Sequence, residues 1–342
     1  MDALKGAVVL ATSLTIALTW QAQAQQVPSA APYPAGKPVS LYVGTDAGGT
    51  TDLIMRMVSR HIGKHLPGNP NVVAKNMPGA GSRKFATYLY SQAPRDGTEW
   101  GIAQRQTVTD PLISDPTLPF RMEELVYIGS PSATTEVCFV WHTTPFQTID
   151  DIKKTQLVLA STSSSERNSY ILEQLTGAKI KTVVGYTGGN DMMLAIERGE
   201  VHGRCSLSWE ALKSNYREWI AGNKIRVLLQ FSFNKHSDLP NVPVITDMAT
   251  NPDDRQALEI LMAPSDIGYP FMAPPGILPE VRDTLRKAFD DTMKDPAFVA
   301  EAEKVKFELY PIDGAKLQTM VDRLYKVSPA VIERAKKLGT PQ

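Results

Sequence analysis

The sequence predicts an α/β protein with two lobes, each built on a doubly wound, mostly parallel sheet, joined by two crossings of the chain. Short apolar strands alternate with amphipathic helical segments between residues 39 and 103, and again between residues 137 and 230. This alternation is typical of sheets with helices on both faces. A helical C-terminal part is expected to pack back on the first lobe, which requires the two crossings.

The first lobe is assigned to residues 38–136 plus 264–342. Its early strands and helices are expected, in chain order, at 39–43, 51–65, 71–75, 82–92 and 99–103. Pro94, Asp96 and Gly97 mark the turn before the last of these strands. After an extended crossing at 268–276, the expected helical segments are 279–293, 297–304 and an amphipathic tail at 313–338.

The second lobe is assigned to residues 137–263. Its strands are expected at 137–141, 156–160, 181–184, 203–206 and 224–230. Helices are expected at 148–154, from the end of the Ser161–Ser165 loop to Leu175, and from Met192 to about Gly199. A ligand cleft is expected between the lobes, at the carboxyl ends of the strands.

The N-terminus predicts export. Lys5 precedes an apolar run at 6–20, and Ala22-Gln23-Ala24 follows as a small-x-small site. Residues 1–24 are therefore interpreted as a secretory signal peptide cleaved after about Ala24, with a membrane anchor as the alternative. Residues 25–37 are expected to be a flexible lead-in, and no later segment predicts stable membrane insertion.

Composition argues against two classes of partner. Lys+Arg and Asp+Glu both total 36, so the formal net charge is zero. A chain without excess positive charge does not attract nucleic acid or an anionic membrane over distance. Any recognition of charge must therefore be local.

Two glycine-containing loops are the candidate ligand site of the first lobe. The strand 39–43 runs into a glycine turn that opens a helix near Thr50, where free N–H groups and the helix dipole favour an anion. A second loop at 76–82 repeats the arrangement. The candidate ligand-binding residues are Thr45, Asp46, Gly48, Gly49, Thr50, Gly79, Ala80, Gly81 and Ser82.

The alternative reading of the first loop is a plain strand-to-helix turn capped by Thr50 or Thr51. Dinucleotide and phosphate-loop fingerprints are missing, which argues against a nucleotide. Asp46 is awkward beside a carboxylate, because like charges repel. Asp52, in the first helical turn, is interpreted as structural.

The second lobe contributes two further loops. Hydroxyl groups follow the strand 156–160, and a glycine-containing turn follows the strand 181–184. The candidate residues are Ser163, Ser164, Ser165, Tyr186, Gly188, Gly189 and Asp191. A helix N-cap and an ordinary turn are the respective alternatives. Among cations Arg105 is the preferred carboxylate partner, and Arg167 and Arg204 are alternatives.

Catalytic and metal-binding signatures are missing from the sequence. No serine nucleophile elbow occurs, and none of the five His residues belongs to a His-x-x-x-His site with a Glu base. His61 and His65 share a helix face, but a solvated face is the preferred reading. We therefore expect no enzyme, no cofactor and no metal. Cys138 and Cys205 could form one disulfide or remain two buried thiols.

Several motifs together resemble the receptor family of tripartite tricarboxylate transporters, also called Bug receptors. The resemblance covers about residues 37–310 and includes the late landmarks Ala273-Pro-Pro-Gly276 and Asp295-Pro296. The other matching motifs are Gly48-Gly-Thr-Thr-Asp52, Asn76-x-Pro-Gly-Ala-Gly81, Pro94-Arg-Asp-Gly-Thr98 and Gly185-Tyr-x-Gly188 followed by Gly199-Glu-Val201.

The resemblance implies a fold similar to type II periplasmic binding proteins, and a periplasmic receptor that holds an organic acid between two lobes. It implies that Gly48, Gly49, Thr50 and residues 79–82 hold one carboxylate, while 163–165 and 186–189 close on the other end. Three departures set this chain apart: Thr45-Asp46, Arg105, and the Ser163–Glu166 loop. The ligand identity therefore cannot be transferred.

The expected function is capture of a small organic acid and its delivery to membrane permease subunits of a tripartite transporter. The protein is expected to be monomeric and to close about its crossings when ligand binds. Two alternatives remain: a ligand-sensing receptor for a signalling partner, and an exported hydrolase.

Overall fold

The computed structural model describes residues 33–161, 166–186 and 188–340. The expected signal peptide at 1–24, most of the lead-in, and the candidates Ser163, Ser164 and Ser165 lie outside these residues. Of the predicted lead-in, residues 33–37 are described, and there Tyr33 is buried.

The first sheet has the strand order β11-β4-β10-β3-β1-β2. Its strands are β1 (Val39–Val43), β2 (Val72–Asn76), β3 (Glu99–Ile102), β4 (Val126–Ser130), β10 (Phe271–Ala273) and β11 (Ile312–Asp313). Strands β2 and β3 pair in parallel with β1, whereas β10 is antiparallel to both β3 and β4, and β11 is antiparallel to β4. The sheet is therefore mixed, because the chain returns from the second sheet in the reverse direction and inserts β10 between β3 and β4.

The second sheet has the order β7-β6-β8-β5-β9. Its strands are β5 (Glu136–Trp141), β6 (Leu157–Ala160), β7 (Ile180–Val183), β8 (Gly203–Ser208) and β9 (Ile225–Phe231). Strand β6 pairs in parallel with β7 and β8, while β5 is antiparallel to β8 and β9. The α/β class with two sheets is confirmed, and the reversed strands refine the expectation of mostly parallel sheets.

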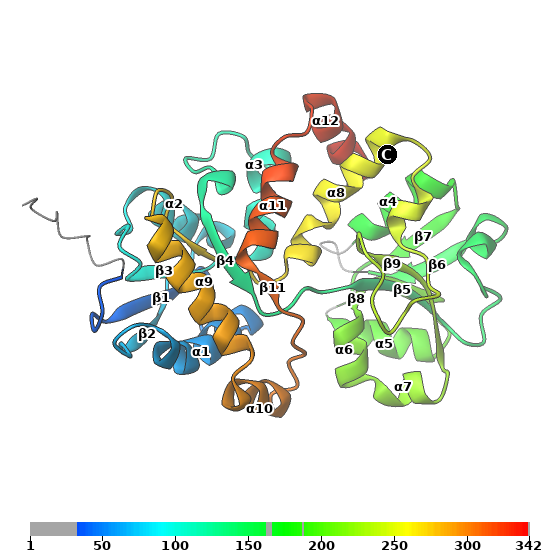
Figure 1. Cartoon of the computed structure of the whole chain (residues 1–342). Coiled ribbons are helices and arrows are strands. Elements are labelled where there is room, and N and C mark those ends of the chain that lie inside the picture. Colours follow the sequence, from blue (N-terminus) through cyan, green and yellow to red (C-terminus); the bar gives the residue numbers. More distant parts are fainter. Residues whose placement is uncertain (1–32, 162–165, 187, 341–342) are drawn as a thin grey trace, which may run out of the picture. The chain divides into compact units, whose positions relative to one another are not determined.

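Twelve α-helices of the described residues surround the two sheets (Figure 1). They are α1 (Thr50–Ile62), α2 (Arg83–Ser91), α3 (Asp110–Ile113), α4 (Arg167–Thr176), α5 (Gly189–Glu197), α6 (Trp209–Asn215), α7 (Arg217–Ala221), α8 (Pro252–Ile267), α9 (Pro279–Met293), α10 (Pro296–Lys304), α11 (Gly314–Leu324) and α12 (Pro329–Leu338). Single 3-10 turns are η1 (Gly63–His65), η2 (Ala80–Ser82), η3 (Arg105–Val108), η4 (Met122–Glu124), η5 (Ile149–Lys153) and η6 (Ile245–Met248).

Side-chain caps explain where several of these helices begin. Ser208, Asn251, Asp295, Asp313 and Ser328 each accept a backbone N–H in the first turn of the helix that follows. Such caps satisfy donors that have no partner inside the helix. Strands β4 and β11 and helices α3 and α6 to α8 were not predicted, whereas the short helix expected at 148–154 is the 3-10 helix η5.

Three hydrophobic cores hold the elements together. One lies between the first sheet and α1, α9 and α10, and another lies between the second sheet and α5 and α6. The third runs through both parts, from Phe85 of α2 through Leu258 of α8 to Ile171 of α4 and Leu338 of α12. Helices α8 and α12 therefore join the two sheets by packing, in addition to the chain crossings.

The predicted lobe boundaries can be placed on these elements. The chain passes from the first sheet to the second between β4 and β5, and it returns between β9 and β10. The predicted boundary at 263/264 falls inside α8, which is one continuous helix. The boundaries 38–136, 137–263 and 264–342 stay a prediction.

Cys138 of β5 and Cys205 of β8 form a disulfide bond. Both residues are buried, and they lie on adjacent antiparallel strands where the register shifts between Val137 and Phe139. The bond therefore joins two strands that the ladder already pairs.

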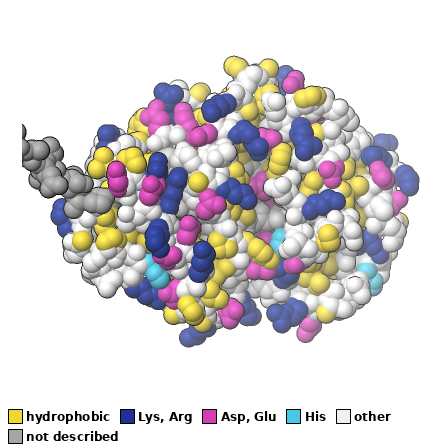
Figure 2. Space-filling model, viewed as in Figure 1, with side chains coloured by type: hydrophobic (Ala, Val, Ile, Leu, Met, Phe, Trp, Pro, Cys, Tyr) yellow, Lys and Arg dark blue, Asp and Glu magenta, His cyan; other side chains and the backbone are white. Residues whose placement is uncertain are grey.

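The described surface carries mixed charge. On the face seen in Figure 2, basic and acidic side chains are interspersed, as the zero formal net charge leads one to expect. No described helix combines the length and the apolar character needed to span a bilayer.

Candidate functional site

The loop between β1 and α1 is held by Asp52. Its carboxylate accepts hydrogen bonds from the Gly48 N–H at 2.9 Å, from Arg56 Nε at 3.0 Å and from Asn76 Nδ2 at 2.8 Å. Burial would raise the pKa of Asp52, but these donors hold it below its ordinary value. Asn76 also donates to the Thr45 carbonyl at 3.0 Å, so Asp52 and Asn76 fix the shape of this loop.

The candidates of this loop differ in exposure. Asp46, Gly48, Gly49 and Thr50 are exposed, whereas the Thr45 hydroxyl oxygen is buried and has no hydrogen-bond partner among the described residues. Gly49 is the N-cap of α1, without a side-chain cap. The expectation that Thr50 or Thr51 caps this helix is therefore wrong.

The second loop has an unusual backbone. Gly79, Ala80, Gly81 and Ser82 have φ values of 147°, 45°, 63° and 74° in succession. Two of these residues carry a Cβ in a region that L-residues rarely adopt, and such strain persists only where surrounding contacts enforce it. The loop exposes Gly79, Ala80 and Gly81, as an anion-binding backbone requires.

Ser82 supplies these enforcing contacts. It is only 1% exposed. Its hydroxyl donates to the Gly44 carbonyl at 2.9 Å and accepts the Gln104 N–H at 3.0 Å. The Ser82 side chain thus ties the ends of β1 and β3 to the second loop. Ser82 as a ligand-binding residue stays a prediction.

Arg105 lies in η3, directly after β3, beside the second loop. Thr107 of the same turn donates to the Gly81 carbonyl at 3.0 Å. The guanidinium of Arg105 donates to the Thr134 hydroxyl and, at 3.4 Å, to a Glu136 carboxylate oxygen. The other oxygen of that carboxylate accepts Asn168 Nδ2 at 2.7 Å. Arg105 therefore reaches from the first sheet to β5 and is partly neutralised there.

A cavity of about 230 Å³ lies at this point. Residues of η3, β5, α4, β8 and α8 contribute its walls: Arg105, Gln106, Glu136, Arg167, Asn168, Ser206, Leu261, Met262, Pro264 and Ser265. Two arginines face one glutamate, so the formal charge of the lining favours an anion. The structure thus brings Arg105 and the alternative Arg167 to the same cavity.

The turn before α5 holds the candidates of the second sheet. Gly188 is the N-cap of α5 and Gly189 is its first residue, while Asp191 is exposed in the first turn. Tyr186 is partly buried, and burial raises the pKa of its hydroxyl. The Arg204 guanidinium lies beside Gly189, because a Cβ on that glycine would stand 3.8 Å from Nη1.

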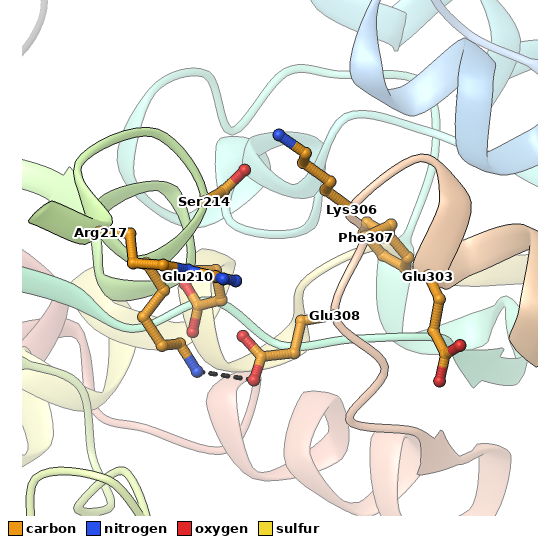
Figure 3. A pocket seen from close by; sticks show the side chains of 8 residues that line it. Glu210, Ser214, Arg217, Glu303, Lys306, Phe307 and Glu308 are labelled. Carbon is orange, nitrogen blue, oxygen red and sulfur yellow. Dashed lines mark hydrogen bonds and ion pairs between the residues drawn. The ribbon is translucent and has the colours of Figure 1, made fainter.

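A larger cavity of about 540 Å³ contains none of the predicted site residues (Figure 3). Its lining mixes three acidic and three basic residues with a serine and a phenylalanine: Glu210, Lys213, Ser214, Arg217, Glu303, Lys306, Phe307 and Glu308. Lys213 of α6 pairs with Glu308 at 2.6 Å and with Asp238 at 2.7 Å. Figure 3 shows Glu303 pointing away from Ser214 and Arg217. No local sequence pattern marks these residues, since the fold alone assembles them.

His61 of α1 and His65 of η1 have carboxylate partners on or next to α10. His61 Nε2 lies 2.7 Å from Glu301, and His65 Nε2 lies 2.9 Å from Asp295. They join two helices, so the expectation of a solvated face is wrong. In the described ranges no group of three or more His, Cys, Asp or Glu side chains could hold a metal ion.

Two sheets linked by crossings, with a polar cavity lined by residues of η3, β5, α4, β8 and α8, define an α/β fold of the solute-binding class. The family model described as "Tripartite tricarboxylate transporter family receptor" matches residues 54–336. The chain belongs to this receptor family, which confirms the resemblance seen in the sequence motifs.

Known relatives agree with this assignment. The UPF0065 protein in the gbd 5' region of Cupriavidus necator is 24% identical over 330 residues, covering 93% of this chain and 91% of that protein. A ligand-free solute-binding protein from Polaromonas superposes with a TM-score of 0.69 at 18% identity, over 90% of this chain and 98% of the other. The R. palustris protein Rpa4515, solved with adipate, superposes with a TM-score of 0.54 at 17% identity, over 89% of this chain and 97% of the other.

Proposed function

We propose that this protein is a periplasmic receptor that captures a small organic acid in the 230 Å³ cavity and delivers it to a tripartite tricarboxylate-type membrane permease. The cavity beside Arg105 carries the proposal. It has an excess of positive charge in a chain with zero formal net charge, and the η3 turn after β3 lines it together with residues of β5 and β8. Family membership and the adipate in Rpa4515 support a carboxylate as ligand.

Export and the transport partner belong to the same proposal. The sequence of residues 1–24 is that of a cleaved signal peptide, which delivers a receptor of this family to the periplasm. There the ligand would contact groups from both sheets, and binding would favour the closed arrangement. The permease would then recognise the closed receptor.

A thermal-shift screen tests the proposal. Mono-, di- and tricarboxylates, aromatic acids and acidic amino acids are added to the mature protein, and a specific ligand raises the melting temperature by mass action. At a concentration of one hundred times Kd, the expected stabilisation is about 2.7 kcal/mol. If no small acid raises the melting temperature, or if candidate esters are turned over, the receptor assignment fails.

Arg105 can be tested in the same assay. Arg105→Ala should weaken binding of the best acid by roughly tenfold, because a charge-assisted hydrogen bond is worth about 1.5–3 kcal/mol. Arg121→Ala is the matched control, since Arg121 is exposed and pairs only with Glu123 and Glu124 among the described residues. Equal affinity of the two variants would remove Arg105 from the site.

A further inference from the structure

Arg204 of β8 is a buried arginine without a carboxylate partner. The residue is 5% exposed. Its Nη2 donates to the Ser206 carbonyl at 3.1 Å and to the Ser206 hydroxyl at 3.2 Å, while its Nε is buried without any hydrogen-bond partner. No carboxylate in the described part of the chain forms an ion pair with it. Buried charges are normally paired, so Arg204 needs an explanation.

The surroundings do not neutralise this charge. A guanidinium remains protonated in proteins, although burial lowers the pKa of Arg204. Tyr216 and Glu136 act electrostatically on Arg204, but the two oxygens of Glu136 already accept from Arg105 and Asn168. The burial of Arg204 is therefore offset by its hydrogen bonds to Ser206 but not by an ion pair among the described residues, and burying an unpaired charge is costly.

A second source of positive potential lies next to Arg204. The helix α5 has nine residues and begins at Gly189, whose missing Cβ would stand 3.8 Å from Arg204 Nη1. Among the described residues no side chain caps this helix start. Its first N–H groups and the positive end of its dipole therefore lie beside the guanidinium.

We propose that Arg204 and the N-terminus of α5 form an anion-binding point that pairs directly with a carboxylate of the ligand. The inference rests on the proposed function, because Ser206, which Arg204 contacts, lines the same cavity as Arg105. A guanidinium offers parallel N–H donors that match a planar carboxylate. The neutral amide of the same acid leaves the charge unpaired and binds more weakly.

The first test needs no ligand. Arg204→Met removes the charge and keeps a long side chain, so the ligand-free variant should melt at or above the wild-type temperature. Arg286→Met is the matched control. Arg286 donates to the Tyr127 carbonyl at 2.9 Å and to the Gly314 carbonyl at 3.1 Å, so its loss should lower the melting temperature.

The second test uses anions of known chemistry. Adipate, succinate, citrate, inorganic phosphate and sulfate are titrated into the wild type and both variants. The carboxylate that stabilises the wild type most should bind Arg204→Met at least tenfold more weakly, with less than a twofold change in Arg286→Met. Phosphate or sulfate binding alone, lost in Arg204→Met, would overturn the assignment to a carboxylate.

Two further outcomes separate this inference from the proposed function. If an acid binds wild type and Arg204→Met equally, the proposed function stands and the Arg204 contact is overturned. If none of these anions and no acid of the thermal-shift screen binds the wild type, the proposed function and the Arg204 contact both fail. A fall in the melting temperature of ligand-free Arg204→Met as large as that of Arg286→Met would show a structural arginine and overturn the anion-binding point.

Discussion

Replacement of Asp266 should change how stability depends on pH. Asp266 lies in α8, partly buried in a cavity of about 260 Å³ that also contains Phe233 and Arg323. Burial raises the pKa of its carboxyl to about 7 from an ordinary value of 3.8, although the Phe233 N–H and Arg323 oppose the shift. The folded protein therefore holds this proton more tightly than the unfolded chain.

The pH-dependent contribution of Asp266 to stability follows from the difference between its pKa in the folded and in the unfolded state. About three pKa units, at about 1.4 kcal/mol each, give roughly 4 kcal/mol. The contribution of Asp266 is fully present below about pH 4, where both states are protonated. This contribution is lost as the pH rises to about 7, because the carboxyl ionises in the unfolded chain but stays protonated in the folded protein. Above that pH both states are ionised, so the free energy of unfolding no longer changes through Asp266.

Urea unfolding of the wild type and of Asp266→Asn at several pH values measures this pH-dependent loss of stability. The Asn side chain can still accept the Phe233 N–H but does not titrate. The free energy of unfolding of Asp266→Asn, relative to wild type, should increase by roughly 4 kcal/mol between pH 4 and pH 8. All other titrations occur in both proteins and cancel.

Asp151→Asn serves as the control. Hydrogen bonds from Thr148, Lys154 and Gln147 hold the pKa of Asp151 below its ordinary value. The stabilising effect of ionised Asp151 is therefore lost only as the pH falls below the pKa of this carboxyl in the unfolded chain. The free energy of unfolding of Asp151→Asn, relative to wild type, should be constant between pH 5 and 8. A difference that is equally flat for Asp266→Asn would refute the burial argument.

Three other substitutions test the links between elements. Ser82→Ala should lower the free energy of unfolding by roughly 2–4 kcal/mol, because the buried Gly44 carbonyl and the partly buried Gln104 N–H lose their partner. A loss below about 1 kcal/mol in urea would contradict this. The double substitution Cys138→Ser/Cys205→Ser removes a disulfide that spans 67 residues. It should lower the free energy of unfolding by about 4 kcal/mol, because the unfolded chain gains conformational entropy. A wild-type melting temperature that does not change with reductant would argue against the bond. Lys213→Met removes the partly exposed ion pair with Glu308 and should lower the free energy of unfolding by about 1 kcal/mol or less. This loss should become smaller in high salt, because salt screens the ion pair. A loss that does not depend on salt would point to packing of the lysine side chain instead.

Local signals account for what could be predicted correctly. Alternation of apolar strands and amphipathic helices indicated the class, and Gly48, Gly79 and Gly81 marked backbone that does take positive φ. The order and spacing of short motifs indicated the receptor family, which the family model confirms over residues 54–336. These features depend on neighbours within a few residues, so the sequence alone carries them.

Long-range contacts account for what could not be predicted. The insertion of β10 between β3 and β4 depends on hydrogen bonds between strands far apart in the chain. Strand β11 has only two residues, which is too short for periodicity to show. The partners of the Ser82 hydroxyl could not be predicted either, because Gly44 and Gln104 lie 38 and 22 residues away.

The sequence by itself determined the α/β class, the family and the presence of glycine loops at the strand ends. Tertiary structure decided which charges are neutralised. Arg105 and Arg204 have the same side chain, yet Arg105 pairs with Glu136, while Arg204 is buried beside the start of α5 without an ion pair among the described residues. Pairing and burial are set by strands that meet only in the fold, and they determine how strongly a buried charge favours an anionic ligand.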